Sequence, residues 1–357
     1  MNVLDDPGVG APVPTLEEWL RYVRTRVDET LAQAIQPPDD ALRALPWTQA
    51  LDQTRQYAGR PGKRLRPALL AAGYGLGGGA ADMPPALWTF GTAVELLHTF
   101  MLIHDDIADG AAMRRGGPAL HRVFGGGKNS EDLAVVMGDY LFARAIEIML
   151  DSGLPRAHLA LRHYLAACRN AASGQYLDCS LERVRLSEVS LFLVLHVAKL
   201  KTALPSFAAP LAAGALLAGA PRPVIDTVTR VGLYLGVAFQ LRDDLLGLFG
   251  DSRTMGKPCD CDLIRGKCTF PVLAAYLRAP EDVRGEMDEL WSVRGAHAGA
   301  LPRARQIVRD HGGLAATERA VAHASRIARA ALRGFPEEDH FRRLLEELTD
   351  SLILRNS

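Results

Sequence analysis

The chain has 357 residues and is 48% hydrophobic, which is enough to bury a large core and by length alone allows about two domains. Lys and Arg together number 41, as do Asp and Glu, so no global field steers the protein toward nucleic acid or an anionic membrane. The five cysteines are an odd number in a chain too long to need disulfide staples, which favours a reducing, cytoplasmic location.

The N-terminal region, residues 1–14, lacks the basic and apolar segments of a signal peptide. We expect it to be a flexible tail in front of one domain that covers 15–357. Thr15 and Glu18 fit a capping box at the start of this domain, and apolar residues then recur at helical spacing until Pro37.

Helical periodicity continues through most of the chain, and the period-two alternation of strands is nearly absent, which predicts an all-α fold. An uncharged stretch from Thr202 to Pro221 has the length of a membrane span, but it is rich in Ala and Gly and is interrupted by proline. We therefore expect a buried core helix there and no membrane span. The other predicted helices cover 67–74, 86–109, 131–151, 156–177, 187–200, 222–249, 268–278 and 339–354.

The apolar helix predicted over 86–109 ends in aspartates, Asp105, Asp106 and Asp109. Residues four apart lie on one helix face with Cβ atoms about 6 Å apart, so Asp105 and Asp109 can present carboxylates to the same ion or ion pair. Such oxygens suit Mg²⁺, which takes one or two protein carboxylates and completes its octahedron with water and phosphate oxygens. A merely solvated acidic turn fits poorly, because the residues before it are apolar. This pattern predicts a Mg²⁺ site.

Asp243 and Asp244 repeat the arrangement in the helix predicted over 222–249. Gly247 stands where a further aspartate would fall, so this second acidic pair is the weaker of the two. Acidic segments on two apolar helices together strengthen the prediction of a metal site, and Asp243 is its candidate ligand in the second segment.

Short basic clusters accompany these acids. Lys63 and Arg66 lie on one face at the start of a predicted helix, where backbone N–H groups also favour anions. Arg114 and Arg115 follow the first acidic segment directly. A single surface Lys or Arg is normally a solubility feature, but this joint placement beside acids and glycines predicts a site for a phosphorylated ligand. The other basic residues near these segments are Lys201, Lys257 and Lys267.

In combination, these residues resemble the trans-isoprenyl diphosphate synthases, also called polyprenyl synthetases, from about Tyr57 to Pro271. The region from Leu97 to Asp109, with Arg114 to Pro118, is similar to the family's first aspartate-rich region, and Phe239 to Asp244 is similar to its second. The other segments that follow the family's order are Gly62 to Pro67, Gly174-Gln175, Lys201-Thr202 and Gly256 to Pro258.

The resemblance implies an all-α isoprenoid synthase fold, a single large antiparallel helical bundle around a central active-site cavity. It implies a Mg²⁺-dependent prenyltransferase, with three ions, that condenses isopentenyl diphosphate with dimethylallyl, geranyl or farnesyl diphosphate. It also implies a homodimer. The released diphosphate is a candidate acceptor for the proton lost in this reaction, because the sequence offers no neutral general base.

The resemblance also implies roles for individual residues. His98 lies about two helical turns before Asp105, so both side chains can face one cavity. The implied metal ligands are Asp105, Asp109 and Asp243, with Asp106 secondary. The residues implied for the diphosphate of isopentenyl diphosphate are Lys63, Arg66, His98 and Arg115. Those implied for the allylic diphosphate are Arg114, Lys201, Lys257 and Lys267, with Thr202 and Gln240 at its reacting end. The residues implied to carry catalysis are Asp105, Asp109, Arg114, Lys201, Asp243 and Lys257.

Phe100 and Met101 lie about one turn before Asp105, where side chains would close the bottom of a product tunnel. An aromatic residue at position 100 resembles the pattern of synthases that make geranylgeranyl diphosphate, with farnesyl diphosphate as the alternative product. Core packing is the other interpretation of Phe100.

Two further functions compete with the synthase. A class I terpene cyclase shares the fold, but its usual second metal motif is not found at Asp243, and it has no need for a second diphosphate site such as Lys63 and Arg66. A non-catalytic partner that regulates a synthase would have damaged metal motifs, whereas Asp105 and Asp109 are intact. Cys259, Cys261 and Cys268 lack a zinc-like spacing and would need a further ligand, so we interpret them as incidental.

Overall fold

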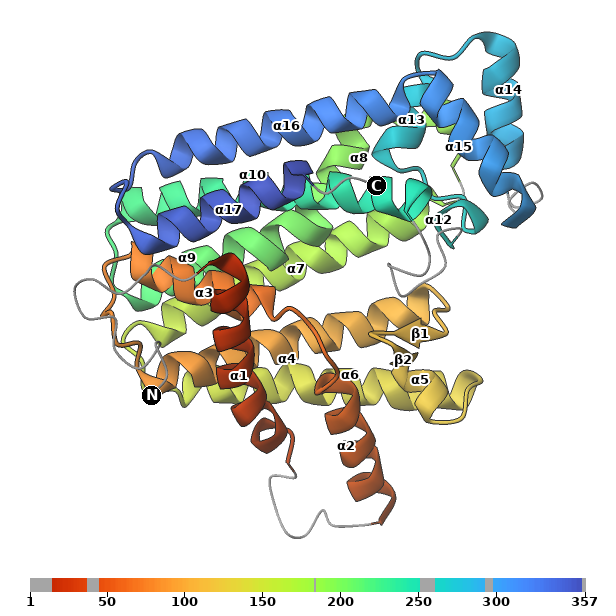
Figure 1. The fold of residues 1–357 in the computed structure, drawn as a ribbon. Helices are drawn as coiled ribbons and strands as arrows, with labels where there is room; N and C mark the ends of the chain where they lie inside the picture. Colours follow the sequence, from red (N-terminus) through yellow and green to blue (C-terminus); the bar gives the residue numbers. More distant parts are fainter. Residues whose placement is uncertain (1–14, 37–44, 183, 251–260, 293–297, 355–357) are drawn as a thin grey trace. The chain divides into compact units, whose positions relative to one another are not determined.

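The computed structural model describes residues 15–36, 45–182, 184–250, 261–292 and 298–354 (Figure 1). The chain divides into two compact units, which we call unit 1 and unit 2. Unit 1 contains Met1–Tyr164, Pro210–Val228 and Phe335–Glu347, and unit 2 contains Leu165–Ala209, Thr229–Gly334 and Leu348–Ser357. The expectation of one domain over 15–357 stays a prediction, and the expected tail at 1–14 lies outside the described residues.

Unit 1 is helical, with one short pair of strands among its described residues. Its strands pair antiparallel, with Met113 opposite Pro118 and Arg114 opposite Gly117. Helices α4 and α6 lie side by side along their length (Figure 1). The elements are α1 Leu16–Ala34, α2 Leu45–Ala58, α3 Leu65–Leu76, α4 Pro85–Ala108, β1 Met113–Arg114, β2 Gly117–Pro118, α5 Leu120–Val123, α6 Lys128–Leu150 and, from its second residue, α9 Ala209–Leu217.

Helix α4 positions the first acidic segment. Pro85 occupies its first turn, where the missing N–H costs no helical hydrogen bond. Almost every residue from Leu87 to Leu97 is buried, and this burial rather than capping stabilises the helix. The helix ends at Ala108, with the Asp109 N–H donating to the Asp105 carbonyl at 2.8 Å. The first acidic segment is therefore the last turn of a core helix, close to the predicted bounds.

Unit 2 contains helices and no strand among its described residues. Helices α13, α15 and α16 pack on one another within it. Helices α7, α10 and α17 each begin in unit 1 and end in unit 2. The elements are α7 Ala157–Leu181, η2 Leu186–Glu188, α8 Leu191–Ala198, η3 Lys199–Ala208, α10 Arg222–Phe249, α12 Cys261–Ile264, α13 Phe270–Tyr276, α14 Glu281–Leu290, η4 Ala298–Ala300, α15 Leu301–Asp310, α16 Gly313–Leu332 and α17 His340–Leu354.

The segment η3 is a π-helix inside the stretch for which the sequence predicted ordinary helices. Pro205 lies within it. A proline ring clashes with the carbonyl four residues earlier, here that of Lys201, and provides no N–H, so the backbone widens at this point. Most residues from Ala203 to Leu217 are buried, so the prediction of a core segment is confirmed while its α-helical geometry is corrected over η3.

The all-α prediction is confirmed, and so is the capping box. The Thr15 N–H donates to Glu18 at 2.8 Å and the Glu18 N–H donates to the Thr15 hydroxyl at 3.3 Å. The predicted ranges left out helices α2, α14, α15 and α16 and the short segments α5, α12 and η4.

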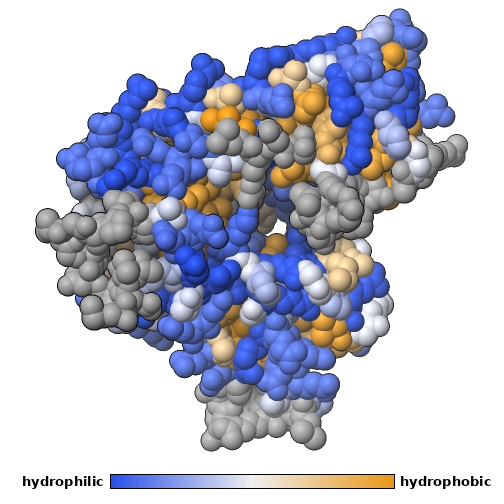
Figure 2. All heavy atoms as spheres, in the orientation of Figure 1, coloured by the Kyte–Doolittle hydropathy of each residue, from blue (hydrophilic) through white to orange (hydrophobic). Residues whose placement is uncertain are grey.

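Three helical stretches of the described chain are long and apolar enough to cross a membrane: Pro85–Ala108, Leu191–Leu217 and Arg222–Phe249. The structure buries 67% of the apolar window in the first of these, 44% in the second and 39% in the third. On the face drawn in Figure 2, hydrophilic residues predominate and hydrophobic ones gather in patches. The absence of a membrane span stays a prediction.

Arg242 connects two elements of unit 2. It lies on α10 between Leu241 and Asp243, and its side chain is buried. Its guanidinium group donates to the carbonyls of Leu352 at 2.9 Å and Ile353 at 3.1 Å, in the last turn of α17. These carbonyls lack partners within their own helix, so Arg242 caps the end of α17.

Candidate active site

The aspartates at the end of α4 have different surroundings. Asp105 and Asp109 are half-buried, whereas the Asp106 side chain is only 1% exposed. Oδ2 of Asp106 accepts a hydrogen bond from the Tyr57 hydroxyl at 2.9 Å, and Oδ1 accepts one from Nε of Arg114 at 2.7 Å. Nη2 of Arg114 also pairs with Asp106 and lies 3.9 Å from Asp105. Asp106 is thus engaged by protein donors on both oxygens.

The short hairpin after α4 holds Arg114 and Arg115. Arg115 has a left-handed backbone conformation (φ 50°), which is uncommon for a side chain of this size. Its Nη2 donates to Glu95 at 3.0 Å. A Cβ on Gly62 would lie 3.1 Å from Cζ of Arg115, so the glycine leaves room for the guanidinium group beside the loop before α3.

A buried ion pair organises that loop. Arg64 begins α3, also with a left-handed backbone (φ 46°), and its side chain is 0% exposed. It donates to Glu95 at 2.8 Å and to Asp28 at 2.9 Å. Glu95 is 1% exposed and accepts from both Arg64 and Arg115 through the same oxygen. One carboxylate therefore holds two arginines whose backbones are strained.

His98 lies on the same helix as Glu95 and is half-buried. Burial lowers the pKa of His98 well below its ordinary value, and the positive charges of Arg66 and Arg115 lower it further. The imidazole is therefore neutral near pH 7, with one nitrogen that donates and one that accepts. A neutral donor beside several cations suits an anionic oxygen. Lys63, in the loop before α3, is exposed.

Unit 2 gathers the second basic set around a carboxylate that the sequence analysis did not single out. Nζ of Lys201, on η3, donates to Asp178 at 2.7 Å, and Nζ of Lys267 donates to the same oxygen at 3.4 Å. Burial raises the pKa of Asp178, but the two lysines outweigh burial and leave the pKa below its ordinary value. Asp178 is therefore an ionised anchor for both ammonium groups.

Glycines bring η3 close to its neighbours in unit 2. A Cβ on Gly174 of α7 would lie 2.5 Å from the Lys201 nitrogen, and one on Gly236 of α10 would lie 2.4 Å from Cα of Ala203. Real Cβ atoms do not approach backbone so closely, so only glycine permits this packing.

Thr202 and Gln240 are also brought together in unit 2. The Thr202 hydroxyl donates to the Gln240 side-chain oxygen at 2.6 Å, and the Gln240 amide donates to Asp244 at 2.8 Å. This chain of hydrogen bonds links η3 to the second acidic pair. Asp243 precedes Asp244 on α10 and is half-buried, and Lys257 lies outside the described residues.

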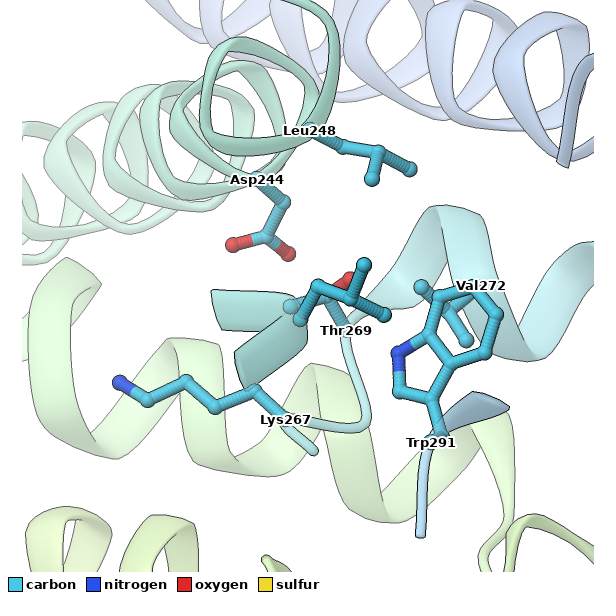
Figure 3. Close-up of a pocket in the computed structure, with 7 residues that line it drawn as sticks. Asp244, Leu248, Lys267, Thr269, Val272 and Trp291 are labelled. Carbon is cyan, nitrogen blue, oxygen red and sulfur yellow. The ribbon is translucent and has the colours of Figure 1, made fainter. Parts of the chain in front are cut away.

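A small pocket in unit 2 adjoins the second acidic pair (Figure 3). Asp244 and Lys267 line it on one side, and Trp291 lines it on another. Cys268 neighbours Lys267 in the sequence, and burial with the charge of Asp244 raises the pKa of its thiol to about 12. The thiol is protonated at neutral pH, which is unfavourable for a metal ligand. Cys259 lies outside the described residues.

Within the described part of the chain, no group of three or more His, Cys, Asp or Glu side chains forms a metal site by itself. Mg²⁺ seldom requires such a cage, because water and substrate phosphates supply most of its ligands. Asp105 and Asp109 have the donor chemistry that Mg²⁺ prefers, whereas Asp106 already accepts hydrogen bonds on both oxygens.

Phe100, the candidate for product length, packs against α6. Its ring centroid lies 5.1 Å from that of Phe142 and 4.9 Å from that of His104. Met101 is half-buried beside it in the sequence. These contacts agree with either interpretation of Phe100, as a tunnel floor or as core packing.

The structure thus places the sequence-predicted residues in two sets. Unit 1 holds the first aspartates, the Arg114 hairpin and the loop before α3, and unit 2 holds the set around Asp178. Sequence reasoning missed Tyr57, Glu95 and Asp178. Glu95 had a usable signal, because it is the one charged residue between Pro85 and His104.

The chain is similar in sequence to proteins of one known family. A model of the polyprenyl synthetase family matches residues 48–308. A geranylgeranyl diphosphate synthase of Mycobacterium tuberculosis is 38% identical over 77% of this chain and 76% of its own length. A geranylfarnesyl diphosphate synthase of Aeropyrum pernix is 35% identical over 82% of this chain and 90% of its own length.

Solved structures are similar as well. That of a geranylgeranyl pyrophosphate synthase from Corynebacterium glutamicum, complexed with isoprenyl diphosphate and magnesium, has a TM-score of 0.84 and 28% identity, and the match covers 96% of this chain and 100% of the other. The family match over most of the chain, the relatives and the acidic and basic segments lead to one conclusion: this chain is a trans-prenyltransferase of the polyprenyl synthetase family.

Proposed function

We propose that this prenyltransferase condenses isopentenyl diphosphate with an allylic diphosphate in a Mg²⁺-dependent reaction and releases geranylgeranyl diphosphate. The observation that carries the proposal is the pair of half-buried carboxylates, Asp105 and Asp109, on one core helix beside the Arg114 hairpin. The magnesium and isoprenyl diphosphate in the Corynebacterium glutamicum synthase structure support the metal and the ligand class.

We propose that three Mg²⁺ ions take part: Asp105 and Asp109 would hold two of them, and Asp243 would hold the third. When bound, these ions would neutralise the negative charge that develops on the departing diphosphate. We assign Asp106 a different role from that of a ligand, because Tyr57 and Arg114 already occupy its oxygens.

The residues of unit 1 are proposed to hold isopentenyl diphosphate. Lys63, Arg66 and Arg115 provide charge, and His98 donates a hydrogen bond as a neutral imidazole. Glu95 keeps Arg64 and Arg115 in place, so the loop before α3 is pre-organised before substrate binds.

For the allylic diphosphate we keep the residues that the family resemblance implies, which are Arg114, Lys201, Lys257 and Lys267. Lys201 and Lys267 are anchored on Asp178, and Lys257 follows the second acidic pair. Thr202 and Gln240 are hydrogen-bonded to each other and are assigned to the reacting end of the substrate. Apolar side chains of the surrounding helices would exclude water from the allylic cation.

The product length rests on Phe100, whose ring packs against Phe142. An aromatic floor at this position limits elongation, which supports geranylgeranyl diphosphate. Farnesyl diphosphate is the alternative, and the relative named for geranylfarnesyl diphosphate shows that similar chains differ in product.

A cytoplasmic homodimer without a membrane span completes the proposal. Helix α6 carries exposed apolar residues at helical spacing: Leu133 is 49% exposed, and Val136 and Leu150 are each 55% exposed. A second copy is their proposed partner, because large apolar side chains in a row on one helix commonly mark an interface. Light scattering of the wild type and of Val136→Glu tests this: we expect a dimer and its weakening. A wild-type monomer would contradict it.

One assay tests the function. The purified chain is supplied with Mg²⁺, labelled isopentenyl diphosphate and one allylic primer at a time, and products are separated after dephosphorylation. We expect Mg²⁺-dependent incorporation that ends at the geranylgeranyl chain. Incorporation that ends at a shorter or longer chain would overturn only the product, and no incorporation with any primer would overturn the synthase.

A further inference from the structure

Tyr57 lies at the end of α2, outside the residues to which the proposed mechanism assigns a substrate. We propose that Tyr57 is a positioning residue for the condensation: its hydroxyl holds Asp106 so that Asp106 in turn holds Arg114. The inference rests on the proposed role of Arg114 at the allylic diphosphate. It adds α2, a helix that the sequence did not predict, to the support of the reacting groups.

The geometry at Asp106 leaves little freedom. The Tyr57 hydroxyl donates to Oδ2 at 2.9 Å, and Nε of Arg114 donates to Oδ1 at 2.7 Å. Asp106 and Tyr57 are both buried. A buried carboxylate that lost one of these donors would keep an unsatisfied oxygen, so rotation of Asp106 away from Arg114 would become favourable.

Burial and the neighbouring Asp106 carboxylate also raise the pKa of Tyr57 far above its ordinary value. The hydroxyl therefore remains a donor over the whole range in which a Mg²⁺-dependent enzyme is assayed.

Arg60 supports the same hairpin from the same end of α2. Its guanidinium group stacks over the Tyr57 ring at 4.9 Å, and its Nη1 donates to the carbonyls of Arg114 at 3.1 Å and Pro118 at 2.6 Å. A Cβ on Gly117 would lie 2.8 Å from Cζ of Arg60, so the hairpin has glycine where Arg60 enters. Two residues at the end of α2 therefore support Arg114. Arg60 binds the backbone carbonyl of Arg114, and Tyr57 binds Asp106, the carboxylate that pairs with the Arg114 guanidinium group.

Tyr57→Phe tests the inference because it removes one oxygen atom and no charge. We expect the KM for the allylic diphosphate to rise about tenfold, the loss equivalent to one hydrogen bond to a charged group. The KM for isopentenyl diphosphate should stay within about twofold, because Arg115, which is proposed to bind it from the same hairpin, is held by Glu95 and not by Asp106. Loss of a merely structural contact would not separate the two KM values.

Tyr140→Phe is the matched control. It also removes one tyrosine hydroxyl from unit 1, one that donates to the Gln36 carbonyl at 2.6 Å, far in sequence from the acidic segment. Both KM values should stay at their wild-type values in this variant. A melting curve for each protein checks that Tyr57→Phe folds. Arg60→Met provides a second route if it does not, and it should raise the same KM.

Arg114→Lys separates this inference from the proposed function on which it rests. If Arg114→Lys raises the KM for the allylic diphosphate but Tyr57→Phe and Arg60→Met leave it unchanged, the positioning role is wrong and the proposed role of Arg114 stands. If Arg114→Lys also leaves that KM unchanged, the proposed role of Arg114 is itself wrong.

Discussion

The ammonium group of Lys201 lies 2.7 Å from Oδ2 of Asp178, and Lys267 contacts the same oxygen at 3.4 Å. A shared anion keeps two like charges close together before any substrate arrives. The two lysines lower the pKa of Asp178 below its ordinary value. Protonation of Asp178 therefore destabilises the folded state.

Asp178→Asn should therefore change the acid stability. An aspartate with a lowered folded-state pKa stabilises the fold above its unfolded pKa, about 3.9, and this contribution disappears as the pH falls through the lower folded-state value. We expect the variant to be less stable by roughly 1.5–3 kcal/mol at pH 7 and by much less at pH 3. Urea unfolding at several pH values measures the difference. Asp226→Asn, in an exposed pair with Arg222, is the control and should have little effect.

His98→Gln should keep the affinity for isopentenyl diphosphate, because an amide N–H can replace the N–H of the neutral imidazole as the hydrogen-bond donor. His98→Ala should raise that KM by about tenfold or more, since a hydrogen bond to a charged group is lost. The pKa of His98 is lower in the folded state than in the unfolded state, where it is about 6.5. As the pH falls below that value, protonation of His98 favours the unfolded state, so the wild type becomes less stable. His98→Gln should lose this pH dependence. Equal KM values for Ala and wild type would contradict the role.

Gly174→Ala should damage unit 2, because its Cβ would lie 2.5 Å from the Lys201 nitrogen and neither backbone can move freely. We expect a lower melting temperature together with a loss of activity. Gly285→Ala on α14 is the matched control: a Cβ there meets nothing within 4 Å. Ala is the better helix former by about 0.5–1 kcal/mol, so this variant should melt slightly higher. If Gly174→Ala and Gly285→Ala had the same melting temperature, the close approach of Gly174 to the Lys201 backbone would be absent.

Phe100→Ala should lengthen the product, because it removes the ring that packs on Phe142 and opens space below Asp105. Chromatography of the dephosphorylated products measures the chain length. Phe192→Ala, which truncates an aromatic ring that is 78% exposed, should leave the product unchanged. An unchanged product in Phe100→Ala would mean that Phe100 is core packing only.

Much of the fold was predictable because long helices repeat their apolar residues at a constant spacing. Helix α4 illustrates this, since its apolar run and terminal acids are visible in the sequence and its bounds agree with the prediction to within a few residues. The capping box at Thr15 was readable for the same reason, because both partners lie within one turn.

The pairing of charges was not predictable, since it depends on residues distant in sequence. Glu95 stood out as a lone acid, but nothing local indicates that Arg64 and Arg115 converge on one of its oxygens. Asp178 meets Lys201 and Lys267 only after three segments have packed. The π-helix was missed because Pro205 was interpreted as an interruption, without its effect on the backbone around Lys201.

Arg242 has a consequence for the dynamics of the protein. Its bonds to the carbonyls of Leu352 and Ile353 connect the end of α17 to the α10 turn that contains Asp243. Local unfolding of the last turn of α17 would remove these two acceptors from the buried guanidinium group of Arg242. The α10 turn that carries Arg242 would then be less stable as well. The amides of these two turns should therefore exchange their hydrogens as a single cooperative unit, and the rate of that exchange reports on the helix that presents the second acidic pair.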